Sequence, residues 1–150
     1  MIKLIRTNSE SNDFQKLVVL LDQDLAIRDG DDHPFYAQFN KIDTINHVVV
    51  GYQNEIAVGC GAIKKYSDAL IEIKRMFVLP THRGHGVAGK VLNELEKWAL
   101  ELGYASSILE TGKKQTEAIK LYSKCGYAIT PNYGQYAGIE TSVCMKKALK

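Results

Sequence analysis

The sequence is poor in the features that mark several large classes of protein. Only three cysteines occur among its 150 residues, namely Cys60, Cys125 and Cys144. An odd count without a closely spaced pair fits neither a disulfide framework nor a zinc site, so we expect reduced thiols and no bound metal. Proline is equally scarce, and the three prolines, at positions 34, 80 and 131, each suit a connection between elements.

Long apolar runs and an excess of one charge are also missing. The stretch at 17–21 is far shorter than the roughly 20 apolar residues that a membrane-spanning helix needs. The first residues show no pattern of a signal peptide. Lysine and arginine number 19 against 17 acidic residues, which gives no case for nucleic-acid binding. The sequence therefore predicts a cytoplasmic protein that binds neither membranes nor nucleic acid.

The residues that are present suffice for one apolar core. Hydrophobic residues make up 45% of the chain, and 150 residues is a usual domain size, so we expect a single domain over 1–150. Alternation predicts strands over 2–6, 46–52, 55–64, 69–78, 104–110 and 141–147. Helical spacing predicts helices over 12–28, 35–40, 87–102 and 115–124. We place a hairpin turn at Gln53–Asn54 and the cap of the first helix at Ser9 or Ser11. Hairpin strands followed by alternating strands and helices indicate a mixed sheet with helices on both faces.

The most informative segment is the junction between a predicted strand and the helix at 87–102. It contains Gly84, Gly86 and Gly89, flanked by Arg83 and Lys90. The first turn of a helix presents unpaired N–H groups and the positive end of the helix dipole, and glycines let a bulky anion approach them. The segment therefore predicts a phosphate or diphosphate site, with a tight turn that binds nothing as the structural alternative.

Two nucleotide-binding motifs share part of this pattern. The three glycines have the G-x-G-x-x-G spacing of a Rossmann fingerprint, but the turn follows three predicted hairpin strands, and Glu110 lies slightly beyond the usual acidic position. Residues 84–90 also match the start of a P-loop. Val91 then stands where a magnesium-binding hydroxyl is required. Neither motif is complete.

A third family matches better. Arg83-Gly-His-Gly86-Val-Ala88 resembles the R-x-x-G-x-A diphosphate-binding motif of the GNAT acetyltransferase superfamily. Residues 117–127 resemble its A-x-x-L-Y-x-x-x-G-F/Y signature, and the whole resemblance covers most of 45–147. It implies an α+β fold of three α/β/α layers, with a mixed, mostly antiparallel central sheet of about six or seven strands and helices on both faces. The implied reaction transfers an acetyl group from acetyl-CoA to an amine.

The resemblance also assigns residues to acetyl-CoA. The implied contacts lie on the strand before the turn, on the turn and helix start, and on a glutamine where many members have asparagine: Met76, Phe77, Val78, Arg83, Gly84, His85, Gly86, Val87, Ala88, Gly89, Lys90 and Gln115. The same strand is expected to splay from its neighbour and to offer a free backbone N–H, at Phe77 or nearby, to a developing oxyanion.

Two residues are the candidate catalytic groups. Tyr122 is the implied general acid for the departing thiolate, with an ordinary core aromatic as the alternative. Glu72 is the candidate base, expected on one strand face with Lys74 and Met76, and a solvated or ion-paired carboxylate is the alternative. Three histidines are less favoured titrating groups: His47, His82 and His85.

The acceptor side is less defined. We predict that Arg28, Phe35, Tyr36 and Arg75 bind substrate, with Arg28 and Arg75 together holding a carboxylate of an amino acid-like amine. The acidic residues at 29–32 would instead suit a cationic amine or form only a solvated loop. Residues 132–138 form a second wall, a mobile lid or a plain connection.

The sequence thus predicts an N-acetyltransferase that acts on the primary amine of a small molecule. An enzyme that acetylates a protein N-terminus or lysine is one alternative, and a CoA-binding regulator without activity is another. A homodimer is an open alternative to a monomer, because members of this family are often dimers.

Overall fold

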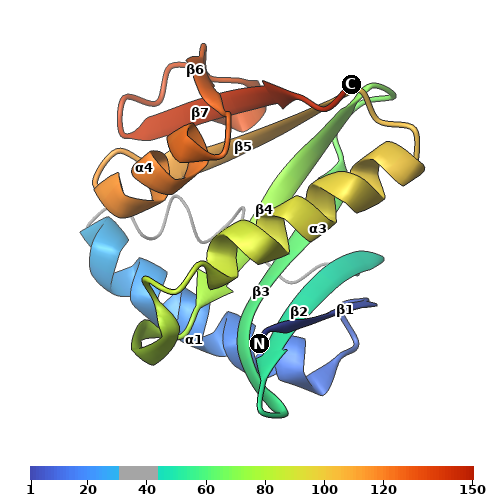
Figure 1. The fold of residues 1–150 in the computed structure, drawn as a ribbon. Coiled ribbons are helices and arrows are strands. Elements are labelled where there is room, and N and C mark those ends of the chain that lie inside the picture. The colour runs from blue at the N-terminus through green and yellow to red at the C-terminus, as the bar shows by residue number, and fades with distance from the viewer. Residues whose placement is uncertain (31–43) are drawn as a thin grey trace.

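The six predicted strands and a short seventh, β6, form one sheet in the computed structural model, which describes residues 1–30 and 44–150 (Figure 1). The strands are β1 Lys3–Thr7, β2 His47–Gln53, β3 Ile56–Lys65, β4 Leu70–Val78, β5 Ser106–Gly112, β6 Ala128–Thr130 and β7 Ser142–Ala148. Their order is β1-β2-β3-β4-β5-β7-β6. Every neighbouring pair is antiparallel except β4 and β5, which are parallel. The predicted mixed, mostly antiparallel sheet is therefore confirmed.

Helices cover both faces of this sheet, as predicted (Figure 1). They are α1 Asn12–Asp29, α3 Val87–Glu101 and α4 Thr116–Lys124, and two short 3-10 turns, η2 Pro80–His82 and η3 Gly134–Tyr136, precede α3 and β7. Side chains of α1 share a buried cluster with β2 and β3, whereas side chains of α3 and α4 share the other main cluster. The predicted short helix at 35–40 lies outside the described residues.

Local sequence explains where helix α1 begins and where helix α3 ends. Ser11 caps α1, because its hydroxyl accepts a hydrogen bond from the Phe14 N–H at 3.2 Å. The apolar face of α3 comprises Val87, Val91, Leu92, Leu95 and Ala99, all buried. Each large apolar side chain buried in this way contributes roughly 1.5–3 kcal/mol. The helix stops before Gly103, whose φ of 95° is unfavourable for other residues.

The hairpin between β2 and β3 differs from the prediction by one residue. Its turn is Asn54–Glu55, with φ values of 51° and 67°, whereas Gln53 stays in the strand opposite Ile56. A two-residue hairpin turn of type I′, which matches the twist of the flanking strands, needs positive φ at both central positions. Asn54 accepts that conformation readily, and the strand register then imposes it on Glu55.

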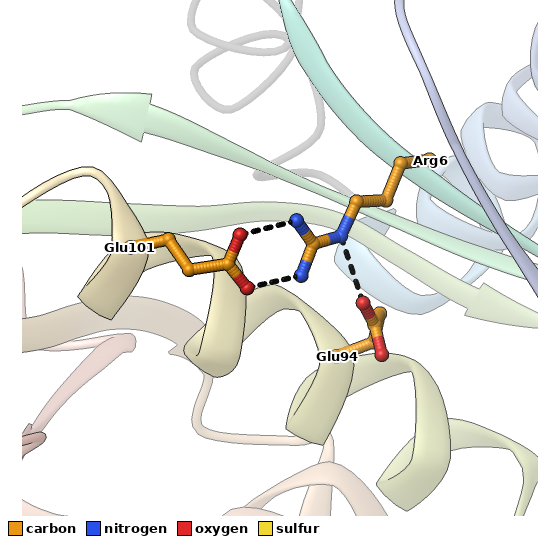
Figure 2. A network of polar contacts seen from close by, with 3 residues as sticks. All are labelled: Arg6, Glu94 and Glu101. Atoms are coloured by element: carbon orange, nitrogen blue, oxygen red, sulfur yellow. Dashed lines mark hydrogen bonds and ion pairs between the residues drawn. The ribbon is translucent and has the colours of Figure 1, made fainter.

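An arginine ties the edge strand β1 to helix α3, as Figure 2 shows. The Arg6 guanidinium donates from Nε to Glu94 at 2.8 Å and from Nη1 and Nη2 to Glu101 at 2.7 Å each. These hydrogen bonds raise the pKa of Arg6 and lower the pKa of Glu101. The contact lies on the α3 side of the sheet.

The sheet opens between its two parallel strands. β4 and β5 pair only through Leu70–Ser106, Ile71–Ser107 and Glu72–Ile108. Beyond Glu72 no β4–β5 pair is formed, so the strands diverge toward the start of α3. Within the described residues, no helix is both long and apolar enough to span a membrane.

Candidate active site

Two cavities lie where β4 and β5 diverge, and they share lining residues. The larger, of about 400 Å³, runs along the end of β4 to the start of α3, and we call it the helix-start cleft. The smaller, of about 110 Å³, lies between β4, β5 and α1, and we call it the inner pocket. Met76, Gln115 and Tyr122 line both. A ligand in the cleft can therefore reach a second molecule in the pocket.

The helix-start cleft ends on unpaired backbone N–H groups. Gly84 and Gly86 have φ values of 82° and 80°, and Gly86 precedes α3 without a side chain to cap it. The first backbone bond of the helix runs from Lys90 N to Gly86 O, so the N–H groups before Lys90 have no partner within the helix. Apart from chain neighbours and the backbone of the helix itself, no heavy atom of the described residues lies within 4 Å of a Cβ built on Gly84, Gly86 or Gly89. The geometry is that of an anion site.

Ten of the twelve residues predicted to bind acetyl-CoA line this cleft: Met76, Phe77, Val78, Arg83, Gly84, Gly86, Val87, Ala88, Gly89 and Gln115. The Arg83 side chain donates from Nε to Val78 O at 2.9 Å, and its guanidinium lies 5.5 Å from the Phe77 ring centroid. His85 and Lys90 are exposed and do not contribute to the lining.

The inner pocket depends on an irregularity in β4. Regular alternation would place Glu72, Lys74 and Met76 on one face, but Met76 packs against Gly61 beside Leu95 of α3, on the other side of the sheet. That part of the prediction was wrong. Arg75 has a φ of 60°, and the register of β3 shifts between Cys60 and Ala62 opposite it. This is the signature of a β-bulge, and a left-handed arginine costs roughly 1–3 kcal/mol.

Glu72 lies in the inner pocket with two polar partners. Its side chain is buried, Oε2 accepts a hydrogen bond from the Tyr133 hydroxyl at 2.6 Å, and Oε1 lies 3.6 Å from Lys74 Nζ. The solvated alternative is therefore excluded, and the carboxylate is held by a donor and a nearby cation. The hydrogen bond from Tyr133 and the nearby Lys74 therefore fix the position of this carboxylate in the pocket.

The 132–138 loop forms a wall of the inner pocket. Tyr136 is buried and lines it, and the Tyr133 ring meets the rings of Tyr66 and Tyr136 edge-on at 5.2 and 5.9 Å. The Asn132 side chain anchors the loop by donating to the carbonyls of Ile139 and Ser142. Burial, and then the Glu72 charge, raise the pKa of Tyr133, so this hydroxyl stays a hydrogen-bond donor.

Sequence reasoning missed the roles of Tyr133 and Tyr136. It singled out only an aromatic, glycine-rich loop, without a residue that reaches the site. Glu110, which also lines the inner pocket, entered that reasoning only as a misplaced Rossmann acid. The sequence did hold one signal for these two residues, because two tyrosines lie close together in a segment that is too polar to belong to the core.

Tyr122 stands between the two cavities on α4. Its side chain is 8% exposed, and its ring meets that of Tyr127 edge-on at 5.9 Å. Burial raises the pKa of Tyr122, and the nearby Cys125 and Glu110 raise it further. The hydroxyl therefore remains protonated at any physiological pH. A raised pKa makes this hydroxyl a weaker acid than a free tyrosine, so it can protonate only a strong base such as a departing thiolate.

The predicted acceptor residues separate in space. Arg75 lines the inner pocket, whereas Arg28 donates to Asp24 at 3.1 Å and lines the helix-start cleft. The structure therefore does not bring the two arginines to one carboxylate site. Phe35 and Tyr36, like the acidic residues 31 and 32, lie outside the described residues.

None of the three predicted alternative titrating histidines lines the inner pocket. His82 lines the helix-start cleft, His85 is exposed, and His47 packs edge-on against Trp98 at 4.8 Å. Across the part of the chain that the structure describes, no group of three or more His, Cys, Asp or Glu side chains could hold a metal ion.

The glycine-rich helix start, Glu72 and Tyr122 all fall within residues 14–127, which match the sequence model of the acetyltransferase (GNAT) family. The chain belongs to this family. An IAA acetyltransferase of Azospirillum brasilense is 37% identical over 102 residues, which cover 67% of this chain and 67% of that protein. The fold and the acyltransferase class predicted from sequence are thereby confirmed.

Solved structures agree with the GNAT assignment along the whole chain. A candidate acyl-CoA N-acyltransferase from Klebsiella pneumoniae has a TM-score of 0.84 at 26% identity, covering 100% of this chain and 99% of its own. A GNAT family acetyltransferase from Elizabethkingia anophelis, solved with acetyl-CoA bound, has a TM-score of 0.68 at 17% identity and covers 98% and 97%. The second likeness concerns the fold alone.

Proposed function

We propose that this GNAT protein transfers the acetyl group of acetyl-CoA to the primary amine of a small molecule, including an amino acid-like one. The observation that carries the proposal is the meeting of two cavities at Tyr122. One ends on the backbone N–H groups at the start of α3, and the other holds the buried carboxylate of Glu72. The name of the Azospirillum relative, an IAA acetyltransferase, supports a small-molecule acceptor.

The helix-start cleft fits acetyl-CoA in chemistry. The glycines around the start of α3 leave open space over unpaired N–H groups, which suits a diphosphate, and Arg83 adds positive charge beside them. Met76, Phe77, Val78 and Gln115 would hold the pantetheine arm along the opened strand. The exposed His85 and Lys90 would act only through charge at the cleft mouth. When bound, the cosubstrate supplies the activated acetyl thioester.

The residues of the chain would perform the proton transfers. An amine attacks only when neutral, and Glu72, held in place by Tyr133 and Lys74, would accept its proton directly or through a water. Tyr122 would donate a proton to the leaving thiolate. A backbone N–H of the diverging strand β4, at Phe77 or a neighbour, would stabilise the developing oxyanion.

An amine screen tests this function. Purified protein with acetyl-CoA is incubated with a panel of amino acids, aliphatic and aromatic amines, and short peptides, and thiol release is followed with mass detection of the product. We expect acetylated product from at least one small amine. Acetyl-CoA binding without amine-dependent thiol release across the panel would instead support a regulator. Release with peptides alone would support a protein N-acetyltransferase.

A further inference from the structure

The bulge in β4 changes the direction of one charged side chain. Ile71 and Ile73 belong to the core on the α3 side, so a regular strand would send Arg75 into that core. The positive φ of Arg75 and the register shift in β3 show that Arg75 is the extra residue of the bulge in β4. Lys74 and Arg75 consequently both project toward α1, and Met76 returns to the α3 side. Two adjacent cations thus face the inner pocket.

Arg75 is buried with only part of its bonding capacity used. Its side chain is 4% exposed, and Nη1 donates to Asp22 of α1 at 2.9 Å. Nη2 is buried and has no hydrogen-bond partner within residues 1–30 and 44–150. A buried guanidinium N–H without a partner is destabilising, so its persistence beside a cavity points to a ligand that completes it.

The inner pocket is lined by two cationic and two anionic side chains. Arg75 and Lys74 supply the cations on β4, and Glu72 and Glu110 supply carboxylates on β4 and β5. Asp22 of α1 forms an ion pair with Arg75, but the Asp22 side chain is 45% exposed and contacts only Nη1 of the guanidinium. Tyr122 and the Tyr133-bound Glu72 mark the place where an amine would react. Arg75 is then the remaining cation for an anionic group on the same molecule.

We infer that the acceptor is an amine that also carries a carboxylate, which Arg75 binds through Nη2. The inference rests on the proposed function and narrows its substrate class to amino acids and related amino carboxylates. A guanidinium suits this role because its planar N–H groups match carboxylate oxygens. The volume of about 110 Å³ limits the buried part of the acceptor to a small head that holds both charges.

Binding to the CoA-saturated protein tests the inference separately from turnover. α-Amino acids and β-alanine are titrated by calorimetry against their matched carboxamides, which keep the amine and lose the negative charge. We expect at least one amino acid to bind tenfold or more tightly than its amide. Arg75→Gln should remove that difference while CoA affinity and the circular dichroism spectrum are retained. If no amino acid is preferred over its amide, the inference is wrong.

Two further variants guard against a folding defect. Arg75→Lys keeps the charge beside Asp22 but lacks the planar fork, so it should show an intermediate preference. Arg6→Gln removes another ion-paired arginine on the α3 side of the sheet and should keep the full preference (Figure 2). If Arg6→Gln also loses the preference for the amino acid over its amide, then the preference depends on stability and not on Arg75. That result would also overturn the inference.

Thiol release on the same panel separates the two proposals. Equal acetylation of amino acids and amides would sustain the transferase and refute the role of Arg75. An Arg75-dependent preference in binding, without acetylation of any compound, would sustain the carboxylate site and refute the transferase. Absence of both preference and acetylation refutes both.

Discussion

Replacement of Gly86 by alanine separates the stability of the α3 start from its use as an anion site. Gly86 has a φ of 80°, and within the described part of the chain only its sequence neighbours lie within 4 Å of the position its Cβ would take. The methyl group therefore fits the free protein, but the left-handed backbone costs an alanine about 1 kcal/mol. In a domain of this length such a loss lowers the thermal midpoint by roughly 2–4 °C.

Gly103 provides the matched control at the other end of the same helix. Its φ is 95°, and its Cβ position is equally open. Gly103→Ala should therefore lose the same stability. If the diphosphate of acetyl-CoA binds at the start of α3, only Gly86→Ala should also weaken acetyl-CoA, by about tenfold or more. The reason is that one hydrogen bond to a charged group is worth roughly 1.5–3 kcal/mol.

Calorimetric titration with acetyl-CoA, and competition with acetyl-pantetheine, complete the test. Acetyl-pantetheine lacks the diphosphate, so neither alanine variant should change its affinity. Equal acetyl-CoA affinities for Gly86→Ala and Gly103→Ala would refute the placement of the diphosphate. An equal loss for acetyl-pantetheine would show that the substitution deforms the cleft as a whole.

Three other substitutions test the remaining roles. Tyr122→Phe should lower kcat by about 10²–10⁴-fold while acetyl-CoA affinity is kept, and unchanged turnover would reduce Tyr122 to packing. Tyr133→Phe should lower kcat while acetyl-CoA affinity is kept, because Glu72 loses the hydrogen bond that orients its carboxylate. An unchanged kcat would remove Tyr133 from the proposed mechanism. Burial lowers the pKa of His47, so the folded state binds its proton less readily than the unfolded state does. The protein is therefore most stable, as far as His47 is concerned, above about pH 6.5, and this stability is lost as the pH falls and burial opposes protonation of the imidazole. The thermal midpoint of His47→Gln should therefore fall less than that of the parent between about pH 7 and pH 5.

The regular elements could be predicted because their patterns are local. The helix predicted over 87–102 and the cap predicted at Ser9 or Ser11 depend on residues within a few positions of one another. The structure confirms both, with α3 at Val87–Glu101 and the cap at Ser11. The three residues of β6 show no pattern of their own. They form a strand only because β7, more than ten residues later, pairs with them.

The contact between Tyr133 and Glu72 could not be predicted in the same way. The two residues are 61 positions apart, and their meeting depends on the path of the 132–138 loop across the sheet. The sequence around Tyr133 does not show which distant residues the loop contacts. It is set by Asn132, which anchors the loop to two carbonyls, and by the rings of Tyr66 and Tyr136.

The direction of Arg75 did leave a trace in the sequence. Lys74 and Arg75 are consecutive cations in a strand whose other residues are mostly buried, and strict alternation would force one of them into the apolar core under α3. Desolvating an unpaired cation there costs far more than the roughly 1–3 kcal/mol of a left-handed residue. A bulge at one of the two cations therefore has the lower free-energy cost. Period-two reasoning ignored this comparison, and for that reason it placed Met76 on the wrong face.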